Sequence, residues 1–313
     1  MFPFYRFFGP FKHYIAVHKQ RAILFYLYRR YAGILDSFAN DNVDTDLTIE
    51  PDSNIWVSWW DGEETMPPLV KACYKSILKH AGTHPVLLIT KYNFKNFVSI
   101  PEYIMEKVNS GLMTVTHFSN ILRANLLYDY GGIWMDATIL VLKDISLDNF
   151  TFFTLKAPEI NGVGASISRF AGLSSGISDK SKRFHNHTEP QISRWSGFLL
   201  AGTMQSPVFA YLRNILYAYW KDHNNQIDYL LFDYTIALGY DNIPVMKKLI
   251  DNVPCSEVEK FVLEKNMNCV FTEENFSQYP LTTFHKLTWK KKFDTHTKDN
   301  KLTIYGHLLD TLQ

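Results

Sequence analysis

The sequence is poor in the residues that would place it outside the ordinary globular proteins. Glycine and proline are few, 15 and 13 residues in 313, which excludes a collagen-like fibre and a low-complexity chain. Only three cysteines are present, Cys73, Cys255 and Cys269, and no two of them have CxxC spacing. They therefore indicate neither a disulfide framework nor a zinc site. Basic and acidic residues balance at 32 against 31, so no global positive field attracts nucleic acid.

Long apolar runs are also missing. No segment approaches the roughly 20 apolar residues of a membrane-spanning helix. Basic residues interrupt the apolar start of the chain, so no signal peptide is expected. The sequence predicts a cytoplasmic protein in a reducing compartment. Aromatic residues, in contrast, are abundant, with 7 Trp, 18 Tyr and 23 Phe. They suit a large core and also sites that stack flat rings such as bases or sugars.

Positive charge is concentrated in the first 40 residues. Six basic residues and one acidic residue, Asp36, give this segment a net charge of +5, and twelve aromatic residues lie among them. Such interleaving is typical of a helix in the headgroup region of an anionic membrane. The alternative is a helical hairpin that packs on the rest of the chain with its basic groups in solvent. We divide the chain into a helical leader, 1–45, and one larger domain, 46–313.

Beyond a polar linker, short apolar runs alternate with helical patterns. Strands are expected at 55–60, 86–90, 133–135, 139–142, 150–155 and 195–201, with a short one near Val115. Helices are expected at 67–78, 100–108, 118–129, 207–220 and 227–238. The alternation favours an α/β fold with a mostly parallel sheet, which binds ligands beyond the carboxyl ends of its strands. Residues 158–190, rich in Gly, Ser, Asn and His, are predicted to form a functional loop or lid.

The most informative stretch is residues 119–138, SNILRANLLYDYGGIWMDAT. It predicts a helix with Asn120 and Arg123 on one face, then a Gly-Gly turn, then a buried strand that ends on Asp136. A carboxylate at the tip of a parallel strand is well placed to meet a ligand, and metal-bridged diphosphate chemistry needs such oxygens. The alternative is that Asp136 caps the turn after the strand, with the help of Thr138.

This stretch resembles the nucleotide-sugar-binding core of glycosyltransferases with the GT-A fold, specifically the bacterial capsular polysaccharide synthesis transferases. Three further blocks resemble the same family in the same order: IWVSWWDGEETMPPLVKAC, IDYLLFDYTIAL and FHKLTWKKK. The resemblance extends over most of residues 53–292. The resemblance implies a Rossmann-like GT-A domain with helical additions. It also implies a hexosyltransferase that moves a sugar from a nucleotide-sugar donor, favouring a UDP-sugar, with retention of anomeric configuration.

The resemblance also implies roles for individual residues. Trp59 takes the position that stacks the nucleobase, and such stacking is worth about 1–3 kcal/mol. Arg123 is placed for the donor sugar and phosphates, where its planar fork matches pairs of oxygens. Asp136 is the first acid of a DxD-type motif, and the catalytic group is Asp136, Arg123 and Asp233. The full donor site comprises Trp59, Ser119, Asn120, Arg123, Gly132, Asp136, Thr138 and Lys290.

A divalent metal, Mn²⁺ or Mg²⁺, is the expected cofactor, held by Asp136 and His285. Two departures from the family pattern bear on it. Asn120 stands where the broader pattern has Asp, and Thr138 stands where the DxD motif has its second acid, as is usual in the capsular branch. One carboxylate is a poor cage for a hard cation, so the donor diphosphate is expected to supply most of the ligands. Outside its block, His285 would be read as an ordinary structural histidine.

The implied acceptor is a lipid-linked or free oligosaccharide in surface polysaccharide synthesis, and Asp228 and Asp233 are candidates for contacting it. The leader would dock the protein on the anionic inner face of the cell membrane. No nucleic-acid partner is expected. The alternative function is a catalytically silent relative that binds a nucleotide sugar or a glycan and acts as an assembly partner, which Asn120 and Thr138 favour.

Overall fold

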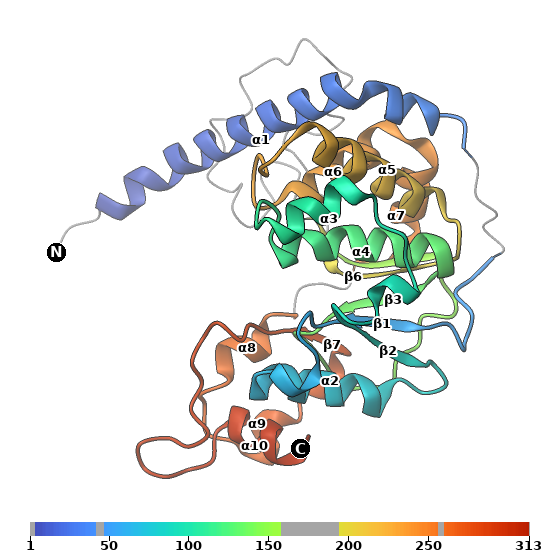
Figure 1. The fold of residues 1–313 in the computed structure, drawn as a ribbon. Coiled ribbons are helices and arrows are strands. Elements are labelled where there is room, and N and C mark those ends of the chain that lie inside the picture. Colours follow the sequence, from blue (N-terminus) through green and yellow to red (C-terminus); the bar gives the residue numbers. More distant parts are fainter. Residues whose placement is uncertain (1–3, 42–46, 158–193, 256–259, 313) are drawn as a thin grey trace.

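The computed structural model describes residues 4–41, 47–157, 194–255 and 260–312 (Figure 1). The loop expected at 158–190 lies outside them. A five-stranded sheet in the order β2-β1-β3-β6-β5 forms the centre. Its strands are β1 (Ile55–Ser58), β2 (Val86–Ile89), β3 (Gly132–Asp136), β5 (Phe152–Lys156) and β6 (Trp195–Gly202). Because β6 is antiparallel to both β3 and β5 while β1 is parallel to β2 and β3, the other four strands share one direction. The predicted α/β fold with a mostly parallel sheet is confirmed.

The register of the sheet brings the carboxyl ends of three strands to one edge. Ser58, the last residue of β1, pairs with Ile89 of β2 on one side and with Asp136 of β3 on the other. The side chains that follow β1 and end β3 therefore meet at this edge, as expected for a ligand site in a parallel sheet.

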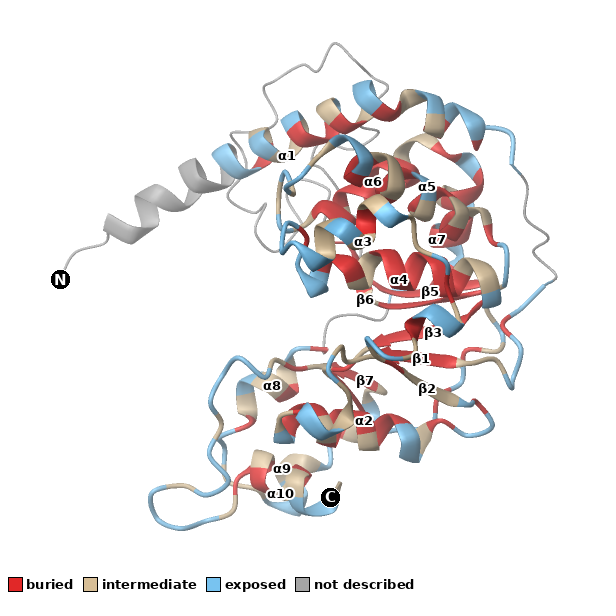
Figure 2. Ribbon diagram, in the orientation of Figure 1, coloured by how far each residue is buried: buried red, intermediate tan, exposed pale blue. Residues whose placement is uncertain are grey.

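One face of the sheet is covered by helices (Figure 1). They are α3 (Glu102–Asn109), α4 (Val115–Tyr130), α5 (Pro207–Asp222), α6 (Leu231–Asn242) and α7 (Pro244–Asn252). The helices α4, α6 and α7 contact the strands directly. Helix α5 packs against these three helices and also reaches the sheet through Phe209, whose ring lies 6.0 Å from that of Phe152 in β5. Figure 2 shows α4 and α6 as predominantly buried, because apolar residues on most of their sides are covered by neighbouring elements.

The other face carries α2 and a small second unit. Helix α2 (Pro68–His80) packs on a two-stranded antiparallel sheet of β4 (Ile139–Val141) and β7 (Phe284–Lys286). Around them lie the helices α8 (Val262–Asn266), α9 (Glu273–Phe276) and α10 (Ile304–Thr311). Short 3₁₀ turns η1, η2 and η5 span Glu63–Thr65, Phe94–Asn96 and Tyr279–Leu281. This unit has its own apolar cluster, formed by Leu69, Cys73, Leu140, Leu263, Met267, Tyr279, Leu287, Ile304 and Leu308.

The leader forms one long helix, α1 (Phe4–Ser37), with non-helical backbone angles at Tyr31. The helical hairpin considered as the alternative for this segment is therefore not formed, but the packing on the rest of the chain that this alternative included is present, since α1 contacts α5 and α6. Its apolar side joins the main core through Ile23, Leu24, Leu27, Tyr31 and Leu35. Lys19 and Arg30 also form ion pairs with residues of the larger domain. No helix in the described residues is both long and apolar enough to cross a membrane.

Two local expectations are wrong for reasons of capping. Val115 begins α4 rather than a strand, because the Thr114 side chain accepts a hydrogen bond from the backbone N–H of His117 and so caps the helix. Helix α6 begins at Leu231 rather than 227, because the Asp228 carboxylate accepts a hydrogen bond from the backbone N–H of Leu230 and holds a turn there.

Gly132 allows the tight passage from α4 into β3. Its φ is +90°, and a Cβ at this position would lie 2.3 Å from the backbone oxygen of Asn54. We expect Gly132→Ala to lower the free energy of unfolding by about 3–5 kcal/mol, measured by urea denaturation. The matched control is Gly62→Ala, where φ is +95° but nothing lies within 4 Å of the added Cβ. It should cost only the backbone strain, about 1–2 kcal/mol, and equal losses at the two sites would contradict the steric explanation.

Candidate active site

A cleft of about 690 Å³ lies at the carboxyl ends of β1 and β3. Its walls come from β1 and the turn after it, the first turns of α4 and α6, the middle of β6, and β7 with the segment that follows. Most residues that the sequence singled out line this one cavity: Trp59, Ser119, Asn120, Arg123, Asp136, Thr138, Asp233 and Lys290. Gly132 does not line it, because it lies at the amino end of β3, away from Asp136.

Arg123 is the most deeply buried charged group of the cleft, with its side chain 6% exposed. Its Nη1 donates a hydrogen bond to the carbonyl of Gly197 in β6, and its Nη2 donates one to Asp136 Oδ1 at 3.0 Å. The guanidinium carbon lies 5.0 Å from the ring centre of Trp134 and 4.9 Å from that of Phe232. Arg123 is thus held between two aromatic faces, where cation–π attraction offsets part of the cost of burial.

Asp136 is the acceptor on which several donors of the cleft converge. Its Oδ1 also accepts a hydrogen bond from Trp134 Nε1 at 3.0 Å, and its Oδ2 accepts one from Lys286 Nζ at 3.0 Å. Burial would raise the pKa of Asp136, but the positive charges of Lys286 and Arg123 outweigh burial and hold the pKa below its usual value. Asp136 is therefore ionised at neutral pH. It accepts these hydrogen bonds from side chains that line the cleft and not from the turn that follows the strand.

Lys286 is a site residue that sequence reasoning missed. It lies on β7, and its Nζ donates to Asp136 Oδ2 and, at 2.7 Å, to the hydroxyl of Thr138. The ammonium also lies 4.8 Å from the ring centre of Phe198. Side chains alternate across a strand, so in FHKLTWKKK the residue after the histidine points to the other side of β7. That period of two was the available signal.

His285 does not reach the cleft. Its ring is buried on the opposite side of β7, with Nε2 3.1 Å from the carbonyl oxygen of Tyr279 and 3.0 Å from that of Thr282. Because both neighbours are acceptors, Nε2 carries a proton and is not a metal ligand in this arrangement. The predicted pairing of His285 with Asp136 around a metal is therefore not formed.

The side chains at Asp136 do not fit a resident Mn²⁺ or Mg²⁺. Such ions take several oxygen ligands, whereas Asp136 already accepts three hydrogen bonds and the Thr138 hydroxyl accepts one from Lys286. No group of three or more His, Cys, Asp or Glu residues placed to hold an ion occurs in the part of the chain that the structure describes. The metal cofactor stays a prediction, without the ligand set expected for it.

Asp233 lies half-buried in the first turn of α6, also facing the cleft. Burial raises its pKa to about 7, against the opposing positive charges of Arg123 and Lys260. At neutral pH the carboxyl group is therefore divided between its two protonation states and can give or take a proton. Asp228, the other acidic candidate, instead forms an ion pair with Lys19 of α1 at 2.5 Å.

Two indoles form one rim of the cleft. Trp59, which follows β1, is half-buried and donates a hydrogen bond from Nε1 to Thr65 Oγ1 at 2.9 Å. Trp289, which follows β7, is 46% exposed, and its ring lies 6.0 Å from that of Trp59 at an angle of 78°. Trp60 packs on Phe94 with only part of its surface in the cleft. The exposed faces of Trp59 and Trp289 are thus the flat apolar surfaces available to a ring of a ligand.

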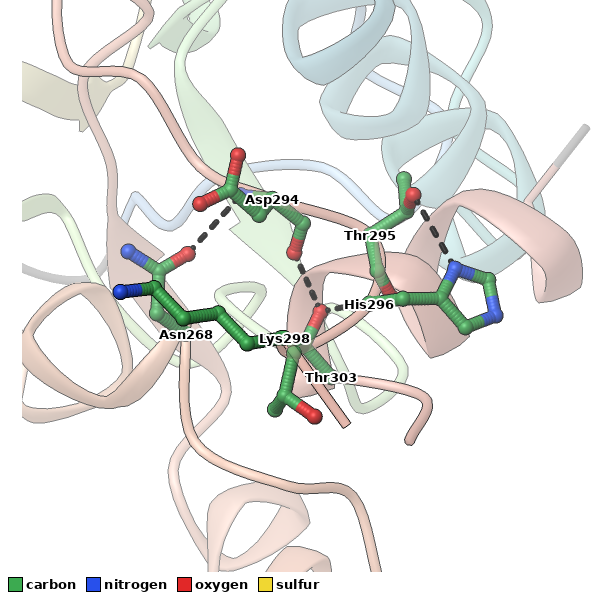
Figure 3. Close-up of a pocket in the computed structure, with 7 residues that line it drawn as sticks. Asn268, Asp294, Thr295, His296, Lys298 and Thr303 are labelled. Carbon is green, nitrogen blue, oxygen red and sulfur yellow. Dashed lines mark hydrogen bonds between the residues drawn. The ribbon is translucent and has the colours of Figure 1, made fainter. Parts of the chain in front are cut away.

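A second pocket, of about 390 Å³, lies near the carboxyl end of the chain (Figure 3). Its polar groups bond mainly to one another: Thr303 Oγ1 donates to the carbonyl of Asp294, and the backbone N–H of Asp294 donates to Asn268. None of the residues singled out from the sequence lines it. The cleft at the strand ends is therefore the candidate active site.

The model of the capsular polysaccharide synthesis protein family matches residues 6–308 of this chain. The chain belongs to this family. The match includes nearly all of α1 as well as the cleft and the second unit. The family model therefore covers most of the leader.

Individual relatives are more distant. The O-glycosyltransferase PaGT of Phomopsis amygdali is 27% identical over 105 residues, which are 31% of this chain and 26% of that protein. The match thus spans about a quarter of that relative's length. Among solved structures, the PaToxG glycosyltransferase aligns with 76% of this chain and 83% of its own at 14% identity, with a TM-score of 0.37. The WbbM bifunctional glycosyltransferase aligns with 87% of this chain and 50% of its own at 12% identity, with a TM-score of 0.42.

The raised pKa of Asp233 has a consequence for stability that this family member should show. Because the folded protein holds the proton more tightly than the unfolded chain does, the free energy of unfolding falls as the pH rises from about 4 to about 7. Asp233→Asn removes this loss, so at pH 8 we expect the variant to be more stable than the original protein by about 1–4 kcal/mol. The gain should shrink towards zero near pH 4.

Urea unfolding of both proteins across this pH range checks the expectation. The control is Asp52→Asn, at an exposed position outside the cleft, which should not reproduce the pH-dependent gain. A difference between Asp233→Asn and the original protein that stays constant with pH would contradict the assignment.

Proposed function

We propose that this chain is a GT-A type glycosyltransferase, which transfers a sugar from a nucleotide-sugar donor to a saccharide acceptor in the synthesis of a surface polysaccharide. The observation that carries the proposal is the convergence in one cleft of flat aromatic faces, at Trp59 and Trp289, with cations around a single ionised carboxylate, Asp136. A nucleotide sugar presents the matching parts, namely a flat base at one end and a diphosphate beside the reacting carbon.

The charges suit a departing diphosphate. Arg123, Lys286 and Lys290 bring three positive charges to the cleft, against the negative charge of Asp136 and the partly protonated Asp233. The remaining acidic residue of the lining, Asp61, forms an ion pair with Lys91. Negative charge grows on the diphosphate as the glycosidic bond to it breaks, and fixed cations that need no reorganisation stabilise that transition state most. Asp136 holds Arg123 and Lys286 in place for this task, since it is bonded to both.

The indoles favour recognition of a base by stacking, and the proposed donor is a UDP-sugar. Trp59 is oriented by its hydrogen bond to Thr65, and Trp289 lies nearly perpendicular to it. Stacking alone accepts any base, so the preference for uracil rests on the family resemblance, which favours a UDP-sugar. Backbone groups around the end of β1 would read the base edge.

The acceptor is proposed to enter beside α4 and α6, where His117, Tyr229 and Asp233 line the cleft. The rings of His117 and Tyr229 lie 6.2 Å apart at 75°, a surface on which a sugar ring can rest. Asp233 is placed to bind an acceptor hydroxyl and, with a pKa of about 7 produced by burial, to exchange a proton with it near neutral pH. We further propose that the anomeric configuration is retained, which NMR of the first-formed product tests.

The proposal includes docking of the protein on an anionic membrane through α1. The side of this helix away from α5 and α6 exposes Ile15 and Phe25, and Arg29 lies 5.9 Å from the ring centre of Phe25. Aromatic and basic groups together are suited to the headgroup region. Such docking would bring the cleft near a lipid-linked acceptor.

A silent nucleotide-sugar or glycan-binding protein is the competing proposal. Its support is that Thr138 replaces the second acid and that Asn120, which also lines the cleft, replaces another. Incubation with a panel of nucleotide sugars, with and without manganese, separates the two. Release of the nucleoside diphosphate, abolished by Asp136→Ala, supports an enzyme, and binding without turnover in the presence of acceptor saccharides supports the silent protein.

Removal of the Trp59 ring should weaken nucleotide binding. We expect UDP to bind more tightly than GDP, and Trp59→Ala to lower the UDP affinity about 5- to 100-fold through the loss of stacking. Calorimetric titration of both nucleotides measures this. Tyr92→Ala, at an exposed aromatic residue outside the cleft, is the control. Tighter binding of GDP would contradict the donor assignment, and an unchanged UDP affinity in Trp59→Ala would contradict the stacking role.

Membrane docking is tested by charge reversal rather than by deletion, because deletion of α1 would remove core residues such as Leu24 and Leu27 and uncover the parts of α5 and α6 on which α1 packs. The double variant Arg6→Glu/Lys12→Glu should bind vesicles of anionic phospholipid at least tenfold more weakly than the original protein, since each basic residue near the surface contributes about 1 kcal/mol. Sedimentation with vesicles at low and high salt measures this. Lys298→Glu/Lys301→Glu, at exposed positions near the carboxyl end, gives the same charge change elsewhere. An equal loss in that control would contradict docking through the helix.

A further inference from the structure

We propose that Lys286 takes the place of a divalent cation in the diphosphate site, so that this chain binds a nucleoside diphosphate without metal. The inference rests on the proposed function, because it assumes that the cleft holds a nucleotide. It concerns a residue from the far end of the sequence, 150 positions after Asp136, that β7 brings to the tip of β3.

The ammonium group of Lys286 bonds to both polar side chains of the DAT sequence. Lys286 Nζ lies 3.0 Å from Asp136 Oδ2 and 2.7 Å from Thr138 Oγ1. It therefore touches both residues of the DAT sequence that correspond to the two acids of a DxD motif. A cation bound by such a motif would have to meet the same two side chains, so the lysine occupies the place that the motif offers to an ion.

The chemistry of Asp136 and Thr138 favours an ammonium group over a divalent ion. A hard cation prefers carboxylate oxygens, whereas a hydroxyl such as that of Thr138 readily accepts a hydrogen bond from an ammonium. The replacement of the second acid by threonine thus lowers the attraction of the pair for a divalent ion and suits a lysine. The remaining carboxylate, Asp136, is already balanced by Lys286 and by Arg123.

Lys286 still has an N–H donor for a ligand. An ammonium has three N–H donors, and two are used in the contacts above. Its side chain is 20% exposed and lines the cleft, so the third donor is available to a phosphate oxygen. Together Lys286 and Arg123 carry two positive charges next to the proposed diphosphate, the same charge as Mg²⁺ or Mn²⁺.

Lys286 is held in place by the strand to which it belongs. Lys286 ends β7, which is paired residue by residue with β4, and β4 packs on α2. The backbone N–H of Lys286 also donates to the carbonyl of Lys260 at 2.8 Å. An ammonium held by a paired strand and by two acceptors is oriented before the ligand arrives, and such preorganisation is what electrostatic stabilisation of a diphosphate requires.

The test measures UDP and uridine binding by calorimetry in EDTA and in manganese, with the full chain. The original protein should bind UDP with affinities that agree within about twofold in the two conditions. Lys286→Met should weaken UDP binding at least about tenfold, the loss expected for a charge-assisted hydrogen bond, and leave uridine binding unchanged. Lys286→Arg should retain most of the UDP affinity. Lys79→Met, at an exposed position on α2 outside the cleft, should behave as the original protein.

The other outcomes distinguish failure of the inference from failure of the proposed function. UDP binding that requires manganese, or that Lys286→Met leaves unchanged, overturns the inference alone, because the cleft would still be a nucleotide site. Failure of the original protein to bind UDP or GDP in either condition overturns the proposed function and the inference with it. If Lys286→Met does not fold, as thermal unfolding would reveal, the metal dependence of the original protein decides the question.

Discussion

The burial of one positive charge organises this molecule. Arg123 lies where α4, β3, β6 and α6 meet, and it is stabilised by the Gly197 carbonyl, by Asp136 and by two aromatic rings. A buried cation that loses its partner is costly, by about 3–5 kcal/mol in comparable pairs. Asp136 is consequently both a ligand-facing group and a support of the fold. Its removal therefore affects stability as well as activity, and the two effects have to be measured separately.

The parts of the fold that depend on local pattern could be predicted from the sequence. Helix α2 and strands β1 and β3 follow from apolar runs and from proline and glycine at their ends. The location of Asp136 at a strand tip followed from the same pattern and pointed to the cleft that is the candidate active site. The alternative of a hairpin in the leader is not formed, because the chain only kinks at Tyr31 and no local signal tells such a kink from a turn. The buried side of α1 is set by its contacts with α5 and α6.

The contacts within the site depend on elements far apart in the sequence, and there local pattern was not sufficient. The family resemblance of FHKLTWKKK pointed to its histidine and not to the lysine after it. Which of the two faces the cleft is decided by the pairing of β7 with β4, a contact between residues about 145 positions apart that no short motif records. The rings of Phe198 and Phe232 were missed for the same reason, since they lie next to Lys286 and Arg123 only after β6 and α6 have packed.

The two sides of α2 belong to different apolar clusters. Val70, Tyr74 and Ile77 lie in the main core, whereas Leu69 and Cys73 lie in the cluster of the second unit. The cleft spans the same division, because Trp59 follows a strand of the central sheet and Trp289 follows β7. A nucleotide that contacts both indoles acts as a non-covalent crosslink between two cores. Under the proposed function, such a ligand would stabilise the folded arrangement of both units and so couple their unfolding.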